Sequence, residues 1–153
     1  MYGKEEALEL RKLFWTSFGK YMGKHRSVHG NKVQWVNYKT RVKDIYFRLE
    51  ADKRTARVFI DLQHRDPEIR DLIFEQFTQL KTVFHDQTET EWEWYPSYTN
   101  EYKTNVARIM IEIEGVNLYN KDTWNDIFPF FEKHMVGLDA FWVEFYDVFK
   151  NLE

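Results

Sequence analysis

The sequence predicts a single α+β domain over residues 1–153, built on a mostly antiparallel or mixed sheet of four to five strands. Three segments, at 43–51, 57–63 and 106–115, alternate apolar and polar residues with the period of a strand. Segments with apolar residues at helical spacing lie before, between and after them. The chain is 43% hydrophobic and 31% charged, a composition that supports a packed core.

The first element is predicted to be a helix at residues 7–24. Leu10, Phe14 and Phe18 recur at helical spacing and give this segment a broad apolar face. Gly23 and the polar run KHRSVHGNK end the pattern. We therefore expect an amphipathic N-terminal helix packed on the sheet.

A strand pair is predicted next, joined by a turn at residues 52–55, with a further short strand before it at 33–39. Residues of one parity in the pair are apolar and are expected to face the core: Ile45, Phe47, Leu49, Ala51, Val58, Ile60 and Leu62. The opposite parity is mostly polar: Tyr46, Arg48, Glu50, Arg57, Phe59, Asp61 and Gln63. The pair therefore predicts a sheet with one buried and one polar face.

The middle helix has the strongest start signal in the chain. Asp66 is placed to cap it, Pro67 suits the first helical position, and Glu68 puts an acid in the first turn. The helix is predicted over 67–84, with one apolar stripe made of Ile69, Leu72, Ile73, Phe77, Leu80 and Phe84.

The remaining elements are two strands and a helical region. A strand is predicted at 91–95, a polar turn at 96–105 and a second strand at 106–115. The final region carries apolar residues at helical spacing, but Pro129 and Gly137 lie inside it. We therefore expect a kink or two consecutive helices there.

Composition excludes several classes of site. The chain has no cysteine, so disulfides, thiolate metal sites and thiol nucleophiles are excluded. It has no phosphate-binding glycine loop and no hydrolase motif, and no apolar run approaches membrane-spanning length. The cytoplasm is the expected location, with no membrane partner. Aromatic residues make up 18% of the chain, and a homodimer that hides part of this aromatic surface is one reading.

Positive charge is concentrated at the start of the chain. Residues 1–43 carry ten Lys or Arg and three Glu, a net charge of +7, whereas the rest of the chain carries −10. Such a split predicts a nucleic-acid or protein-partner site, and an acidic aromatic region at 86–101 is a second partner surface. The alternative is that the basic and acidic halves of the chain face each other or are exposed to solvent, without a partner. The candidate binding residues, where rings stack on bases and cations bind phosphates, are Lys32, Trp35, Lys39, Arg41, Lys43 and Arg48.

The polar strand face supports a second hypothesis, a Mg²⁺-dependent nuclease. The predicted order, α-β-β-β-α-β, is that of a restriction-endonuclease-like core, in which acids on adjacent strands hold the metal. Glu50, Asp61 and Gln63 are the candidate catalytic residues, and Glu50 and Asp61 the candidate metal ligands. Gln63 stands where such a nuclease has a lysine, and an amide cannot act as a charged activator of water. Cross-strand ion pairs are the alternative explanation of these charges.

Several stretches also resemble a known family. FWTSFGKYM, VFIDLQHRDPEIRDLIF, EWEWYP and LDAFWVEFYDVF are similar to the bacterial family catalogued as domain of unknown function 4268. The resemblance implies no established activity. It implies an association with nuclease-like or restriction modules, because members occur alone or fused behind them. The leading hypothesis is therefore a non-enzymatic accessory or binding module linked to restriction, defence or other DNA-related systems, with no cofactor.

Overall fold

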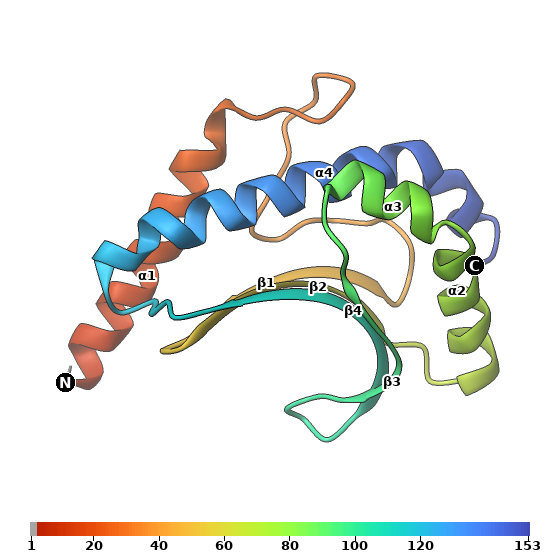
Figure 1. Ribbon diagram of the computed structural model, residues 1–153, viewed down its shortest axis with the longest axis horizontal. Helices are drawn as coiled ribbons and strands as arrows, with labels where there is room; N and C mark the ends of the chain where they lie inside the picture. The colour runs from red at the N-terminus through yellow and green to blue at the C-terminus, as the bar shows by residue number, and fades with distance from the viewer. Residues whose placement is uncertain (1–2) are drawn as a thin grey trace.

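Four strands form one antiparallel sheet in the order β1-β2-β4-β3 (Figure 1). They are β1 (Ile45–Ala51), β2 (Thr55–Leu62), β3 (Glu93–Thr99) and β4 (Asn105–Glu114). The hairpins β1–β2 and β3–β4 are joined by the pairing of β2 with β4. The structure is a computed structural model that describes residues 3–153. The predicted α+β class and four-to-five-stranded sheet are confirmed.

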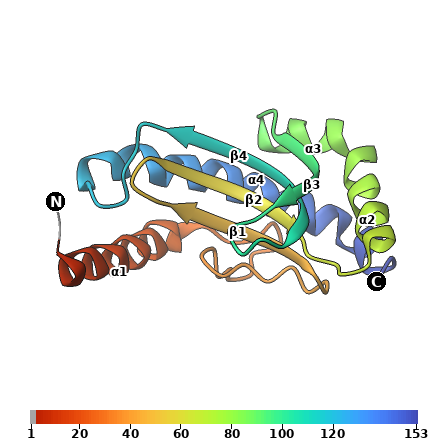
Figure 2. The ribbon, with the colours of Figure 1, turned by 90° about the horizontal axis from the view of Figure 1, so that it is seen from below.

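The helices lie mainly on one face of this sheet. They are α1 (Lys4–Tyr21), α2 (Pro67–Gln79), α3 (Lys81–Thr88) and α4 (Trp124–Lys150), with short 3-10 turns at Met22–Lys24 and Lys121–Thr123. Figure 1 shows α4 along the sheet with α1 and α3 beside it, and α2 at one end. The other face is concave, and within residues 3–153 no helix covers it (Figure 2). No helix within that range combines the length and apolar character needed to cross a membrane.

Strand alternation divides the side chains between these two faces as predicted. Core residues on the helix side include Ile45, Phe47, Val58, Ile60, Leu62, Ala107 and Ile109, all buried. Residues of the other parity point toward the concave face. Side chains alternate along a strand. The register that buries the apolar residues against the helices therefore places the charged residues of opposite parity together on the concave face.

The order of elements differs from that of the predicted restriction-endonuclease-like core. Two strands precede the middle helices and two follow them, giving α-β-β-α-α-β-β-α. The strand predicted at 33–39 is wrong, because that segment is an irregular loop. Trp35 is buried and anchors the loop, and Arg41 and Asp44 adopt positive φ angles of 63° and 65°, which break an extended course. The restriction-endonuclease-like core is not confirmed.

The middle helix begins as predicted and is broken near its end. The Asp66 carboxylate accepts a hydrogen bond from the Glu68 amide at 2.9 Å, and Pro67 occupies the first turn. The helix then ends at Gln79, and α3 begins at Lys81. The break turns the chain so that Phe77 and Phe84 both contact Phe141 of α4, with ring centroids 6.1 and 5.1 Å away. The apolar stripe is narrower than predicted, because Ile69 and Leu72 are exposed.

The structure rejects one of the two forms predicted for the last helical region and shortens the turn predicted before β4. The helix α4 is one element with Pro129 inside it, not two consecutive helices. Pro129 lies in the second turn, where the loss of one hydrogen bond leaves most of a 27-residue helix intact. The polar turn predicted at 96–105 is shorter, because β3 continues to Thr99. It passes Pro96 at an edge position with a bulge between Tyr95 and Tyr98.

Gly137 allows α4 to approach α3 closely. A Cβ atom there would lie 2.8 Å from the Gln87 carbonyl oxygen and 3.0 Å from the Thr88 Cα, and neither backbone atom can rotate away. Gly137→Ala is therefore expected to lower the free energy of unfolding by about 1–2 kcal/mol, since overpacking exceeds the gain in helix propensity. Chemical denaturation measures this. Gly19→Ala in α1, which meets open space, should raise stability by about 0.5–1 kcal/mol. An equal response of both variants would contradict the close contact.

Candidate functional site

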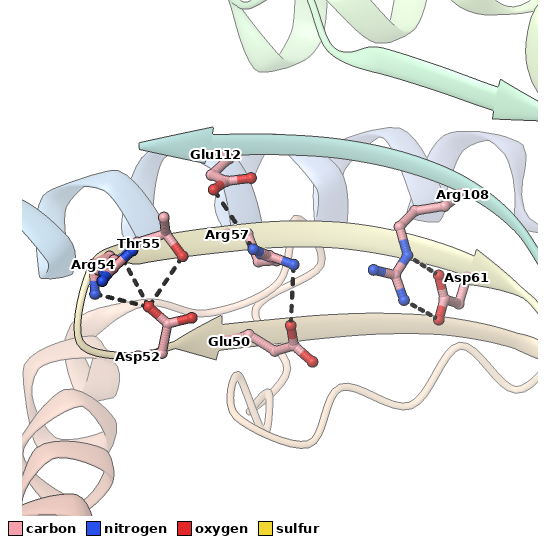
Figure 3. Close-up of polar contacts among 8 residues, drawn as sticks. All are labelled: Glu50, Asp52, Arg54, Thr55, Arg57, Asp61, Arg108 and Glu112. Carbon is pink, nitrogen blue, oxygen red and sulfur yellow. Dashed lines mark hydrogen bonds and ion pairs between the residues drawn. The ribbon is translucent and has the colours of Figure 1, made fainter. Parts of the chain in front are cut away.

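Asp61 and Arg108 form a buried ion pair on the concave face of the sheet. They lie opposite each other on β2 and β4, and only 3% and 5% of their surfaces are exposed. Arg108 Nε donates to Asp61 Oδ1 at 2.6 Å, and Arg108 Nη2 donates to Oδ2 at 3.0 Å (Figure 3). The guanidinium also lies 4.0 Å from the ring centre of Phe59 and 4.3 Å from that of Tyr98. Both carboxylate oxygens of Asp61 are therefore occupied by a cation held between two rings.

The pKa of Arg108 reflects these surroundings. Burial lowers the pKa, the hydrogen bond and charge of Asp61 raise it, and the net direction is upward. The guanidinium therefore stays charged beside the carboxylate.

Glu50 and Gln63 do not join Asp61 in a three-ligand group. Glu50 lies opposite Arg57, four positions along β1 from Tyr46, which is the residue opposite Asp61. Glu50 and Glu112 flank Arg57, whose nitrogens approach them at 3.8 and 3.5 Å (Figure 3). Gln63 follows the end of β2, and its backbone N–H donates a hydrogen bond to the Asp44 carbonyl oxygen at 2.8 Å. Within residues 3–153 no three His, Asp or Glu side chains are grouped to hold a metal ion.

The remaining groups of this face also have structural partners. Burial is the largest influence on Glu50 and raises its pKa. At the turn between β1 and β2, Asp52 accepts hydrogen bonds from the Arg54 and Thr55 amides at 2.8 and 2.9 Å (Figure 3). Burial raises the pKa of Asp52, the turn hydrogen bonds lower it, and the net direction is downward. The carboxylates of Figure 3 thus act as partners for arginines and turn amides.

The positive charge of the chain gathers on a loop between α1 and β1. We call residues 20–43 the basic segment; it contains seven Lys or Arg and no Asp or Glu. Figures 1 and 2 show that it runs from the end of α1 past α4 to the edge strand β1. Lys24 pairs with Glu132 of α4 at 3.5 Å. All seven cations are exposed: Lys20, Lys24, Arg26, Lys32, Lys39, Arg41 and Lys43.

Most of the candidate binding residues come together here. Lys39, Arg41, Lys43 and Arg48 line one groove of about 440 Å³ beside β1. Trp35 does not belong to this set, since only 5% of its surface is exposed and its ring anchors the loop in the core. Four of the candidate cations therefore share one groove, without the predicted tryptophan.

A second depression, which we call the loop groove, lies between the basic segment and α4. Its volume is about 650 Å³, and Lys32, Lys39 and Arg41 line it together with Tyr38, Asp139 and Trp142. Asp139 is 3% exposed; its Oδ1 accepts from the Tyr38 hydroxyl at 2.5 Å and its Oδ2 from the Ser27 hydroxyl at 3.0 Å. Burial, followed by the bond to Asp139, raises the pKa of Tyr38.

Three further contacts fix the basic segment on α4. The Trp142 indole donates to the Thr40 carbonyl at 2.9 Å. Glu132 accepts from the Tyr21 hydroxyl at 2.6 Å and pairs with His25. The hydrogen bond to Glu132 raises the pKa of Tyr21 to about 12. The loop is therefore attached to the helix near both of its ends.

The comparison with family models adds the affiliation of the chain. A model described as a domain of unknown function, DUF4268, matches residues 10–146. The protein belongs to the DUF4268 family. No curated protein and no solved structure matches the chain. The resemblance of the sequence motifs to this family is confirmed, and a role for this DUF4268 chain must be argued from its own residues.

Sequence reasoning missed the floor of the loop groove. Ser27 and Tyr38 each lie more than a hundred residues from Asp139 along this DUF4268 chain, so no local motif joins them to it. One signal was present in the sequence. Asp139 interrupts the apolar stripe of the last helix, between Leu138 and Trp142, and an acid on a buried helix face needs a partner.

Proposed function

We propose that this protein is a non-catalytic module that binds nucleic acid through its basic segment. The observation that carries the proposal is the run of seven cations without an acid, all of them exposed on a segment attached to α4. Lys and Arg bind phosphate oxygens whatever the base sequence, and they release counterions as they do so. The rest of the chain carries a net charge of −10, so a polyanion is attracted to this segment and repelled elsewhere.

Two observations favour binding without hydrolysis. Both oxygens of Asp61 bond to the buried guanidinium of Arg108, and the positive charge of that group would repel a Mg²⁺ ion at this carboxylate. Gln63 follows the end of β2, and its side-chain amide has no charge with which to activate a water molecule. The concave face is better suited to stabilise the sheet than to cut a phosphodiester.

Reversing charge in the basic segment tests the proposal. The triple variant Lys39→Glu, Arg41→Glu, Lys43→Glu should weaken binding of a labelled oligonucleotide and reduce the salt dependence of log K by about one for each lost phosphate contact. Fluorescence anisotropy over a series of salt concentrations measures both quantities. Single-stranded and duplex oligonucleotides are compared in parallel.

A matched triple variant changes net charge by the same amount elsewhere. Lys53→Glu, Lys103→Glu, Lys121→Glu alters three exposed cations outside the basic segment. This control should bind almost as the unaltered protein does. Equal losses in the two triple variants would show that net charge alone matters, and absence of binding by the unaltered protein would reject the proposed function.

A further inference from the structure

The loop groove has a basic rim and an acidic floor. Binding of a phosphate backbone would require only the basic rim. Lys32, Lys39 and Arg41 line its sides, whereas the buried carboxyl group of Asp139 lies at its base on α4. A phosphate would be repelled by that carboxylate. The groove therefore fits a ligand with an anionic part at the rim and hydrogen-bond donors that reach deeper.

Asp139 retains capacity to accept further hydrogen bonds. A carboxylate offers about four acceptor positions and, when ionised, donates none. In this structure its oxygens accept one bond each, from the hydroxyl groups of Ser27 and Tyr38. Both donors are neutral, so neither supplies a positive charge to balance the carboxylate. A ligand that donates further hydrogen bonds to the carboxylate would stabilise it in this buried position.

The donor pattern of the ligand can be deduced from this floor. Guanine presents two adjacent donors on its Watson–Crick edge, the N1–H and the N2 amino group, which match the two oxygens of a carboxylate. Adenine and cytosine place an acceptor nitrogen beside their amino group, and thymine and uracil place carbonyls on both sides of their single N–H. Those acceptors would face the carboxylate and be repelled. Guanine is the base that an acceptor-only floor selects.

The sides of the groove suit the rest of a nucleotide. The rings of Tyr38 and Tyr146 line it, and an aromatic ring can stack on any base. The volume of about 650 Å³ lies in the range of small-molecule sites and exceeds that of a single base. Lys32, Lys39 and Arg41 in the lining supply positive charge for the phosphates next to an inserted base.

We propose that the loop groove receives one unpaired guanine of the bound strand, with Asp139 accepting hydrogen bonds from its N1–H and N2 amino group. This inference rests on the proposed function, since the basic segment must first hold the strand. It adds a base preference that phosphate contacts cannot give. A base in a duplex has its Watson–Crick edge occupied, so single strands, loops or ends are the target.

Single-base substitutions in the ligand test the inference without altering the protein. Labelled single-stranded octathymidines carry one central guanine, adenine, cytosine, hypoxanthine or 1-methylguanine, and their affinities are measured by anisotropy at one salt concentration. Guanine should bind roughly tenfold to a hundredfold more tightly than adenine or cytosine. Hypoxanthine, which lacks the amino group, should be intermediate, and 1-methylguanine should have no advantage. Equal affinities for all five would overturn the inference while leaving phosphate binding in place.

Two variants locate the preference. Asp139→Asn replaces one acceptor oxygen with a donor and should remove the guanine advantage without changing the salt dependence. Ser27→Ala keeps the carboxylate and should keep the advantage. A loss of affinity for all strands alike in Asp139→Asn, with the guanine advantage intact, would overturn the role of Asp139 in reading the base. No binding of any strand would instead reject the proposed function itself.

Discussion

Replacing Arg108 with alanine is expected to lower the free energy of unfolding by about 3–5 kcal/mol. The variant leaves the Asp61 carboxylate buried and without its cation, and it also removes the contacts of the guanidinium with Phe59 and Tyr98. Desolvation of an unpaired charge is the main cost. Urea denaturation followed by circular dichroism measures the effect.

A second arginine on the same face provides the control. Arg57 flanks Glu50 and Glu112 at 3.8 and 3.5 Å, but the Glu50 side chain is 43% exposed. Water screens this network, so Arg57→Ala should cost no more than about 1 kcal/mol. The double variant Asp61→Leu, Arg108→Met removes both charges and should regain most of the lost stability. Equal costs for Arg57→Ala and Arg108→Ala would contradict the burial of the pair.

Trp142→Ala should have a cost of similar size, about 3–5 kcal/mol. The indole is 3% exposed and packs among Phe47, Phe77 and Phe149, so truncation leaves a large cavity. It also removes the hydrogen bond to the Thr40 carbonyl, which attaches the basic segment to α4. The same denaturation experiment measures the loss.

Trp142→Phe separates the two contributions. The ring remains to fill most of the cavity, but the buried Thr40 carbonyl loses its donor, which should cost about 1–3 kcal/mol. The loop would then be held less firmly, and nucleic-acid affinity should fall with it. A Trp142→Phe variant as unstable as Trp142→Ala would contradict the importance of the packing.

The strands of the sheet could be predicted because alternation is a local signal. Ile45 and Phe47 on one side and Arg48 and Glu50 on the other fix the faces of β1 without knowledge of its partner. The start of α2 was equally local, since capping by Asp66 depends on neighbouring residues. The final helix was harder, because whether Pro129 breaks it depends on how near it lies to the helix start.

The elements that failed depend on contacts between distant parts of the chain. The segment around Trp35 resembles a strand in composition, but it is held by α4 and not by a neighbouring strand. The break at Leu80 directs Phe84 toward α4. No residue near Leu80 in the sequence predicts this break. Tertiary contacts of this kind override local propensity.

The candidate site divides in the same way. Parity placed Asp61 and Glu50 on one face, but only the register shows that Arg108 stands opposite Asp61 and Glu50 does not. The basic segment was visible from composition, because charge is counted without a fold. The loop groove was not visible, since its floor combines Ser27 and Tyr38 with Asp139 from the other end of the chain.

Binding without cleavage is the central claim, and one titration tests it most directly. A labelled single strand is titrated with the unaltered protein in Mg²⁺ over a series of monovalent salt concentrations, and the strand is then recovered on a denaturing gel. The logarithm of the binding constant should fall linearly with the logarithm of the salt concentration, with a slope that corresponds to several phosphate contacts. The strand should be intact on the gel. Affinity that does not change with salt, or a strand cut by the unaltered protein and left whole by Asp61→Asn, would contradict the claim.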